Sequence, residues 1–167
     1  MATNTPLIAL MGNPNSGKTA IFNLLTGLHQ KVSNYPGITV EKRKGTAQLF
    51  QNNEVEILDM PGTYSLTPES LDEKIVAQQV LEWMHGKDPP AAIISVVDAG
   101  NLSRNLYLTT QLLDLDIPVI VALNMMDRIK RKNHNIDCDA LKKMLGASAV
   151  VPMSALKKWG IEELQQE

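Results

Sequence analysis

A polar loop between two glycines carries the residues best suited to chemistry. It reads GNPNSGKT from Gly12 to Thr19 and follows the apolar run LIALM. In the pattern G-x-x-x-x-G-K-[ST], Gly12 and Gly17 let the backbone turn so that successive N–H groups face a phosphate chain, and the following helix N-terminus adds positive potential. Lys18 would reach the β and γ phosphates, and Thr19 would offer its hydroxyl to Mg²⁺. The alternative is a glycine-rich turn with a solvated lysine, but the flanking strand and helix patterns favour a phosphate-binding loop.

A second motif, D-x-x-G, is formed by Asp59 and Gly62 at the end of another apolar run. Asp59 would contact the Mg²⁺ shell, and the N–H of Gly62 would sense the γ-phosphate. By itself the motif is weak, because Asp-x-Pro-Gly is also an ordinary turn.

The third motif, N-x-x-D, comprises Asn124 and Asp127 with Met125 between them. It suits guanine, because one carboxylate can accept hydrogen bonds from both the N1–H and the 2-amino group, and adenine offers no such pair of donors. Alone it could be a helix-capping loop, but its position after a phosphate loop strengthens the assignment. A fourth stretch, Ser154-Ala155-Leu156, would offer a backbone N–H to the guanine oxygen.

The elements that must position these motifs alternate along the chain. Short apolar runs rich in β-branched residues predict buried parallel strands, and periodic stretches between them predict helices. A more polar segment, 40–50, is expected to form an edge hairpin with the next strand. The expected strands are 7–11, 55–60, 91–99, 119–124 and 149–153, and the expected helices are 18–26, 71–85, 103–115, 137–145 and one from 161 onward. This order predicts an α/β fold with a mostly parallel six-stranded sheet, helices on both faces and ligands at the carboxyl ends of the strands.

Composition limits the function classes. The 167 residues suffice for one domain, and a net charge of −2 with no long charge run argues against nucleic acid as a partner. The single cysteine, Cys138, excludes an internal disulfide, and the three histidines lack metal-ligand spacing, which fits a reducing cytoplasm. The start of the chain lacks the features of a secretion signal, and no stretch reaches the roughly 18 apolar residues of a membrane span, so we expect a soluble chain.

Four ordered motifs at successive strand ends indicate a GTPase, and longer stretches resemble one family. GNPNSGKT, NYPGITVEKRKG, DMPGTYSLTPESLDEKI and VVDAGNLSRNLYLTTQLLDLDIPVIVALNMMD are similar to the amino-terminal GTPase domain of bacterial ferrous iron transport protein B. The resemblance covers nearly the whole chain. It implies a Ras-like P-loop GTPase fold that binds GTP or GDP with Mg²⁺.

The resemblance also implies a context. In that family the domain lies at the cytoplasmic face of the inner membrane, is followed by a helical spacer domain, and precedes a membrane region that passes Fe²⁺ inward. We therefore expect residues 1–167 to be a single GTP-binding domain and a fragment of a longer protein, whose GTP cycle regulates or drives iron uptake. A homo-oligomer is possible, and the partners are otherwise the guanine nucleotide and the missing domains.

Carried over onto this sequence, the motifs define a set of expected site residues. Ala20 stands where the family often has a second threonine, directly after the phosphate loop. The residues expected to act in hydrolysis are Lys18, Thr39, Asn15 and Gly62. The residues expected to contact the nucleotide are Gly12, Asn13, Pro14, Asn15, Ser16, Gly17, Lys18, Thr19, Ala20, Gly37, Thr39, Asp59, Gly62, Asn124, Met125, Asp127, Ser154, Ala155 and Leu156.

The first switch segment is expected between His29 and Val40. Thr39 is the candidate to bind Mg²⁺ through its hydroxyl and the γ-phosphate through its N–H, so that the loop is ordered by GTP. Pro36 and Gly37 allow a sharp chain path. Without the resemblance, Thr39 could simply be a β-branched residue that opens a strand.

The second switch segment is expected from Thr63 to Asp72. Ras-like enzymes place a water-orienting glutamine directly after the D-x-x-G glycine, and this chain has Thr63 there. With no obvious general base, hydrolysis would depend on positioning and electrostatics, and intrinsic turnover should be slow.

Asn15 distinguishes this phosphate loop. Its side-chain carbonyl would lie beside the β and γ phosphates, where it could bind a monovalent cation. Several GTPases that share this asparagine and lack the catalytic glutamine use K⁺ in this way, and the resemblance implies the same role here. The alternative is that Asn15 only hydrogen-bonds the loop backbone, as asparagine often does in turns.

Two other functions remain open from the sequence. One is a GTPase of ribosome assembly or tRNA modification, although such proteins usually carry a basic appendage that this chain lacks. The other is a nucleotide sensor that hardly turns over. The basic cluster Arg128, Lys130, Arg131 and Lys132 is interpreted as a solvated helix face, and Trp159 as a partly buried packing residue.

Overall fold

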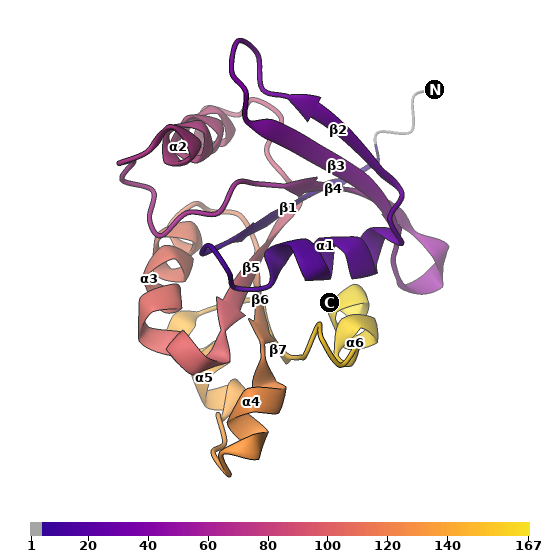
Figure 1. Cartoon of the computed structure of the whole chain (residues 1–167), viewed down its shortest axis with the longest axis vertical. Helices are drawn as coiled ribbons and strands as arrows, with labels where there is room; N and C mark the ends of the chain where they lie inside the picture. Colours follow the sequence, from indigo (N-terminus) through magenta and orange to yellow (C-terminus); the bar gives the residue numbers. More distant parts are fainter. Residues whose placement is uncertain (1–4) are drawn as a thin grey trace.

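One mixed β-sheet with helices on both faces makes up the computed structural model, which describes residues 5–167 and, for Phe50, only the backbone (Figure 1). Residues 1–4, on which the expected lack of a secretion signal partly depends, lie outside this range. The strands follow the order β2-β3-β4-β1-β5-β6-β7 across the sheet. Their bounds are β1 (Leu7–Gly12), β2 (Gln30–Asn34), β3 (Glu41–Gln48), β4 (Glu54–Asp59), β5 (Ala92–Asp98), β6 (Val119–Asn124) and β7 (Ala149–Pro152).

The neighbouring strands β4, β1, β5, β6 and β7 are parallel to one another, whereas β3 is antiparallel to both of its neighbours, β2 and β4. The α-helices connect and cover these strands, and two short 3₁₀ helices join them. Their bounds are α1 (Lys18–Thr26), η1 (Phe50–Asn52), α2 (Leu71–Met84), η2 (Ala99–Asn101), α3 (Leu102–Leu113), α4 (Met126–Arg131), α5 (Cys138–Leu145) and α6 (Ile161–Gln166).

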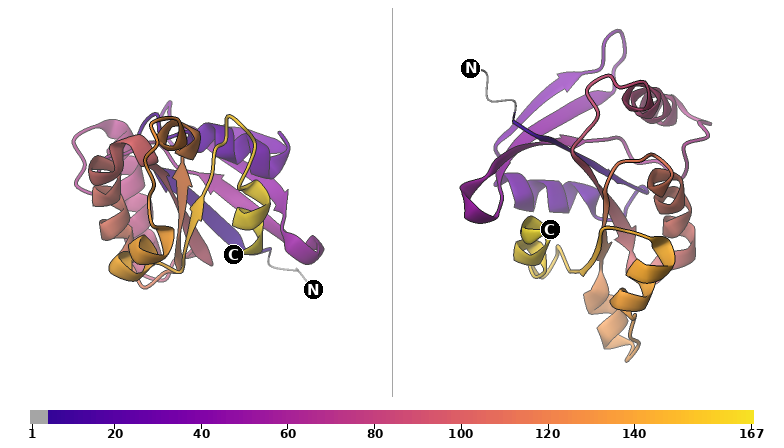
Figure 2. Two further views of the ribbon diagram at one scale, coloured as in Figure 1. Left: turned by 90° about the horizontal axis from the view of Figure 1, so that it is seen from below. Right: turned by 180° about the vertical axis from the view of Figure 1, so that it is seen from behind.

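Alternate residues of the central strands face two different helical layers. On β1, Leu10 packs in the cluster that includes Phe22 of α1, whereas Ala9 and Met11 pack in the cluster that includes Trp83 of α2. Helices α1 and α6 therefore cover one face, and α2 and α3 cover the other (Figure 2). Burial on both faces explains why the strand sequences are almost continuously apolar.

The predicted α/β architecture agrees with this structure, but the sheet has seven strands and not six. The additional strand is β2, which lies inside the segment expected to be the first switch. All five of its residues are exposed, so it has no apolar pattern that could reveal a strand. Backbone pairing with β3, from Gln30 opposite Gly45 to Asn34 opposite Glu41, holds it in place.

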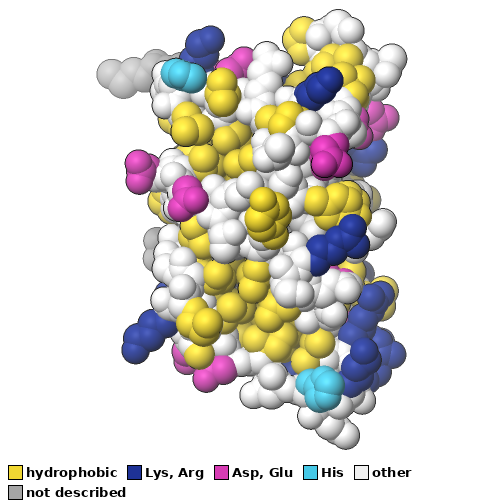
Figure 3. All heavy atoms as spheres, turned by 90° about the vertical axis from the view of Figure 1, so that its left-hand side faces the viewer, with side chains coloured by type: hydrophobic (Ala, Val, Ile, Leu, Met, Phe, Trp, Pro, Cys, Tyr) yellow, Lys and Arg dark blue, Asp and Glu magenta, His cyan; other side chains and the backbone are white. Residues whose placement is uncertain are grey.

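Apolar side chains also reach the surface over α2 and α3 (Figure 3). Leu81 and Met84 on α2 and Tyr107 on α3 are each more than half exposed. Within residues 5–167, no helix is long and apolar enough to cross a bilayer.

Candidate functional site

The phosphate loop connects β1 to α1 and lines a cleft of about 510 Å³ at the carboxyl end of the sheet. Its glycines are required by close approaches. Gly17 has a left-handed backbone with φ of 92°, and a Cβ there would collide with the side-chain amide of Asn124. A Cβ on Gly12 would lie 2.8 Å from the Val96 carbonyl oxygen. The cleft is lined by Asn13, Pro14, Asn15, Gly17, Lys18, Thr19, Ala20, Gly62, Asp72 and Met125.

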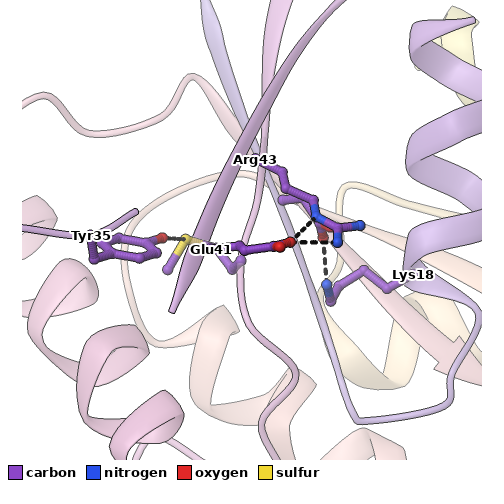
Figure 4. Close-up of polar contacts among 6 residues, drawn as sticks. Lys18, Tyr35, Glu41 and Arg43 are labelled. Carbon is purple, nitrogen blue, oxygen red and sulfur yellow. Dashed lines mark hydrogen bonds and ion pairs between the residues drawn. The ribbon is translucent and has the colours of Figure 1, made fainter. Parts of the chain in front are cut away.

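Lys18, which lines this cleft, pairs with Asp59. Its ammonium group, labelled Lys18 in Figure 4, forms an ion pair with the carboxylate. Both side chains are at most 10% exposed. Two buried opposite charges stabilise each other where either alone would be costly. The sequence motifs G-x-x-x-x-G-K-[ST] and D-x-x-G are therefore parts of one site.

Asn124 links the phosphate loop to the expected guanine-binding segment. Its Nδ2 donates to the Ser16 carbonyl at 2.9 Å, and its Oδ1 accepts from the N–H of Ala155 at 3.0 Å. Because the residue is 2% exposed, it cannot exchange these partners for water. One buried amide thus joins the first and fourth motifs.

Asp127 is oriented from two sides. Ser154 Oγ donates to Asp127 Oδ1 at 2.8 Å, and Arg131 lies 3.3 Å from Oδ2. Met125, with a left-handed φ of 64°, turns the chain from β6 into α4 and lines the cleft. Ala155 is buried and Leu156 is 77% exposed, so the loop presents its apolar side chain outward.

Thr63, which stands in the place of the water-orienting glutamine, is fully buried. Its N–H donates to the Gly12 carbonyl at 3.1 Å, and its hydroxyl donates to the Ser65 carbonyl at 2.6 Å. The preceding Gly62 packs against Pro14, because a Cβ on Gly62 would lie only about 3.2 Å from Pro14 backbone atoms. The Thr63 hydroxyl is therefore used within the second switch segment.

The first switch segment is anchored by Tyr35, which the sequence analysis did not single out. Its ring is buried, and its hydroxyl contacts Met60 Sδ at 3.7 Å, directly beside Asp59 (Figure 4). Burial, and secondarily the charge of Asp59, raises the pKa of Tyr35 to about 12. The sequence signal that could have identified this anchor was a lone aromatic residue in a polar stretch.

The structure does not bring Thr39 or Gly37 to the cleft. Thr39 is exposed, and neither residue lines the cavity beside Lys18. A turn closed by a hydrogen bond from the Tyr35 N–H to the Val40 carbonyl holds both residues away. Asp72, at the start of α2, lines the cleft instead, although no motif had pointed to it.

A smaller polar cavity of about 180 Å³ lies behind the phosphate loop, toward α3. Asn13 and Ser16 line it, and in the described part of the chain their buried side-chain polar atoms have no hydrogen-bond partner. Both residues belong to the expected nucleotide-binding loop. Asn13 lines both cavities, whereas Ser16 lines only the smaller one.

Oxygen donors suited to a hard cation are present in the main cleft. Thr19 supplies a hydroxyl, and Asn15 supplies an amide on a left-handed backbone with φ of 63°. The buried carboxylate of Asp59 does not line the cleft itself but pairs with Lys18, which does. Between residues 5 and 167, no group of three His, Cys, Asp or Glu side chains is arranged to hold a metal ion.

Comparisons with known proteins agree on one family. Residues 6–167 match the family described as "Ferrous iron transport protein B". The Fe(2+) transporters FeoB of Escherichia coli K12 and Shigella flexneri are each 48% identical to this chain over 162 residues, which are 95% of this chain. The chain spans only 20% of the length of these relatives.

Solved structures are similar as well. A variant NFeoB of S. thermophilus bound to mGDP has a TM-score of 0.87 at 45% identity and covers 96% of this chain and 59% of its own. The cytosolic domain of T. maritima FeoB in GDP form I has a TM-score of 0.86 at 38% identity, with coverage of 97% and 61%. The cytosolic domain of L. pneumophila FeoB has a TM-score of 0.86 at 46% identity, with coverage of 95% and 65%.

Proposed function

The chain belongs to the ferrous iron transport protein B family, and we propose that it is the part of such a transporter that binds and hydrolyses GTP and couples this cycle to Fe²⁺ uptake. The observation that carries the proposal is the position of Asn124, whose amide joins the phosphate loop to the loop of Ala155. This contact makes a phosphate site and a guanine site continuous. Relatives whose structures contain GDP support the same ligand.

The residues of the cleft have separate roles in this proposal. Backbone N–H groups of the loop bind the phosphate oxygens, and Lys18 leaves Asp59 to contact the β and γ phosphates. Thr19 and Asp59 would hold Mg²⁺, which would supply positive charge to neutralise the phosphates. Asp127, oriented by Ser154, accepts from guanine. Thr39 reaches the nucleotide cleft only when the first switch segment rearranges toward the γ-phosphate.

Slow intrinsic turnover follows from the second switch segment. The Thr63 hydroxyl donates to the Ser65 carbonyl, so this side chain is not available to orient the attacking water molecule. Catalysis would then come from charge stabilisation at the phosphates. We propose that Asn15 contributes by holding K⁺ there, since this residue lines the cleft and is exposed to it.

The proposed context is the cytoplasmic face of a bacterial inner membrane. Because the relatives are about five times longer than the matched part, we propose that a helical spacer and a membrane permease region occur in the same protein. The comparisons do not favour a GTPase of ribosome assembly or tRNA modification.

Nucleotide titration tests the proposal. Calorimetry with Mg²⁺ should show binding of GTP and GDP and at least about 100-fold weaker binding of ATP, since Asp127 discriminates by paired hydrogen bonds. Equal affinity for ATP, or no binding of GDP, would refute the guanine assignment. Single-turnover phosphate release then separates a GTPase from a nucleotide sensor, because a sensor would leave bound GTP intact.

A further inference from the structure

The loop from Ser154 to Trp159 closes on itself directly after β7. Ser154 N–H donates to the Trp159 carbonyl at 3.1 Å, and Trp159 N–H donates to the Ser154 carbonyl at 3.2 Å. Inside this bridge, Lys158 N–H donates to the Ala155 carbonyl at 3.2 Å. The residues that face the nucleotide base are therefore held in a loop whose two ends are tied by Trp159.

The end of the loop is fixed further by Gly160. Its backbone is left-handed with φ of 85°, and a Cβ there would lie 2.5 Å from the Met153 Cβ. The backbone directly after Trp159 therefore packs closely against Met153, the residue that precedes Ser154.

The Trp159 side chain connects this loop to α4. Its indole is half-buried and packs against the apolar cluster that includes Ile129 and Leu141. Lys130 Nζ lies over the ring, 4.4 Å from its centre, within the range of a cation–π contact. Since α4 also carries Asp127, one indole contacts both segments expected to bind guanine.

We propose that Trp159, clamped by Lys130, is a positioning residue that holds Ser154 against Asp127 and thereby sets guanine discrimination and the residence time of GDP. The proposal rests on the function proposed above. The chain of contacts is continuous, because Trp159 holds the Ser154 backbone and the Ser154 hydroxyl donates to Asp127 Oδ1 at 2.8 Å. If the indole is lost, the backbone hydrogen bonds between residues 154 and 159 remain, but residue 159 loses its anchor on α4. The bonded pair can then shift, and the carboxylate no longer presents both oxygens to N1–H and the 2-amino group.

Removal of the indole is the first test. GDP dissociation and the affinities for GDP and IDP are measured for the parent, Trp159→Phe and Trp159→Ala. IDP lacks the 2-amino group, so the ratio of the two affinities reports how well Asp127 is oriented. We expect Trp159→Ala to release GDP about tenfold faster and to reduce the GDP preference over IDP about fivefold, with Trp159→Phe between it and the parent.

This ratio distinguishes positioning from simple packing. A packing role would lower the melting temperature of Trp159→Ala and leave the GDP to IDP ratio of the folded protein at the parent value, and that result would overturn the proposal. Failure of the parent itself to bind GDP would instead refute the proposed function.

The clamp is tested separately through Lys130. Lys130→Met removes the charge and keeps the aliphatic stem, and it should raise the GDP dissociation rate about threefold, the effect expected of a partly exposed cation–π contact. Lys130→Arg should restore the parent rate. The matched control is Lys143→Met, an exposed lysine on α5 that should leave the rate unchanged. If Lys130→Met released GDP at the parent rate, or if Lys143→Met increased the GDP dissociation rate equally, the proposed contact between Lys130 and Trp159 would be contradicted.

Discussion

Lys18 and Asp59, 41 positions apart in the sequence, form a buried ion pair at the adjacent carboxyl ends of β1 and β4. The pairing of β1 with β4 places Leu10 opposite Asp59 and so fixes the distance between the two motifs. In the function proposed above, binding of a magnesium nucleotide would separate this pair, because Lys18 would contact phosphate and Asp59 would contact the cation.

The ion pair gives the first prediction. Asp59→Asn and Lys18→Met should each lower the free energy of unfolding by about 3 kcal/mol, because each leaves a buried charge without its partner. The double variant Lys18→Met/Asp59→Asn should lose clearly less than the sum of the single losses. Urea unfolding without nucleotide measures these values. Additive losses in the double variant would show that the two charges do not stabilise each other.

Base selection gives the second prediction. Asp127→Asn replaces one acceptor oxygen with a donor and should weaken GTP binding by about 1 to 3 kcal/mol while favouring xanthosine triphosphate. Titration calorimetry with both nucleotides measures the exchange. Asp114→Asn, an exposed carboxylate at the end of α3, is the matched control and should bind GTP like the parent. Unchanged GTP affinity in Asp127→Asn would count against the guanine contact.

The first switch segment gives the third prediction. Thr39→Ala should slow GTP hydrolysis and leave GDP affinity nearly unchanged, since the expected contacts involve only Mg²⁺ and the γ-phosphate. Hydrolysis is followed by phosphate release under single-turnover conditions, with GDP affinity measured in parallel. The conservative Thr39→Ser, which keeps the hydroxyl, should retain most of the rate. Hydrolysis at the parent rate in Thr39→Ala would exclude Thr39 as the switch residue.

The monovalent cation gives the fourth prediction. The parent should hydrolyse GTP faster in KCl than in NaCl at equal ionic strength, and Asn15→Ala should lose this difference but still bind GDP. If the parent hydrolysed GTP at the same rate in KCl and in NaCl, the proposed role of Asn15 would be rejected. Loss of GDP binding in Asn15→Ala would assign the residue to loop structure instead.

The start of α2 gives the fifth prediction. Ser70 and Glu73 form a reciprocal cap in which Ser70 Oγ accepts from the Glu73 N–H and the Glu73 carboxylate accepts from the Ser70 N–H. Ser70→Ala should therefore lower the free energy of unfolding by about 1 kcal/mol and leave nucleotide affinity unchanged. Chemical denaturation at pH 7 measures this loss.

The same cap has a pH dependence. The N–H of Glu69, above all, lowers the pKa of Glu73 below its ordinary value. The stabilisation is thus fully present above the unfolded pKa and is lost as the pH falls through the folded pKa. Glu73→Gln should be less stable than the parent at pH 7, and the gap should shrink at acidic pH. A gap that stays constant would contradict this origin.

Much of the fold could be predicted because burial leaves an apolar pattern in the sequence. The predicted helix 18–26 coincides with α1, which buries some of its apolar positions, and the predicted strand 119–124 coincides with β6, a run whose six residues are all buried. The strand β2 left no such trace, because backbone hydrogen bonds alone hold it at the sheet edge. Local sequence cannot reveal pairing that depends on a partner strand.

The site was predictable to the extent that its residues form short motifs. Asn124 donates to the carbonyl of Ser16 in the loop that carries Lys18, which is the proximity expected when strand ends of a parallel sheet meet at one edge. The anchor made by Tyr35 and the clamp made by Lys130 and Trp159 depend on contacts between distant segments. No spacing rule encodes such contacts, so they became visible only in the folded chain.

The position of β2 determines what a rearrangement of the first switch segment would disturb. This strand borders only β3, and its five side chains are solvated, so detaching it exposes almost no apolar surface. Tyr35 is the one buried side chain in the neighbouring turn that must be extracted. The free energy of such a movement is therefore separate from that of the core between α1 and α3, and mutations could tune the rate of switching without altering the melting temperature of the domain.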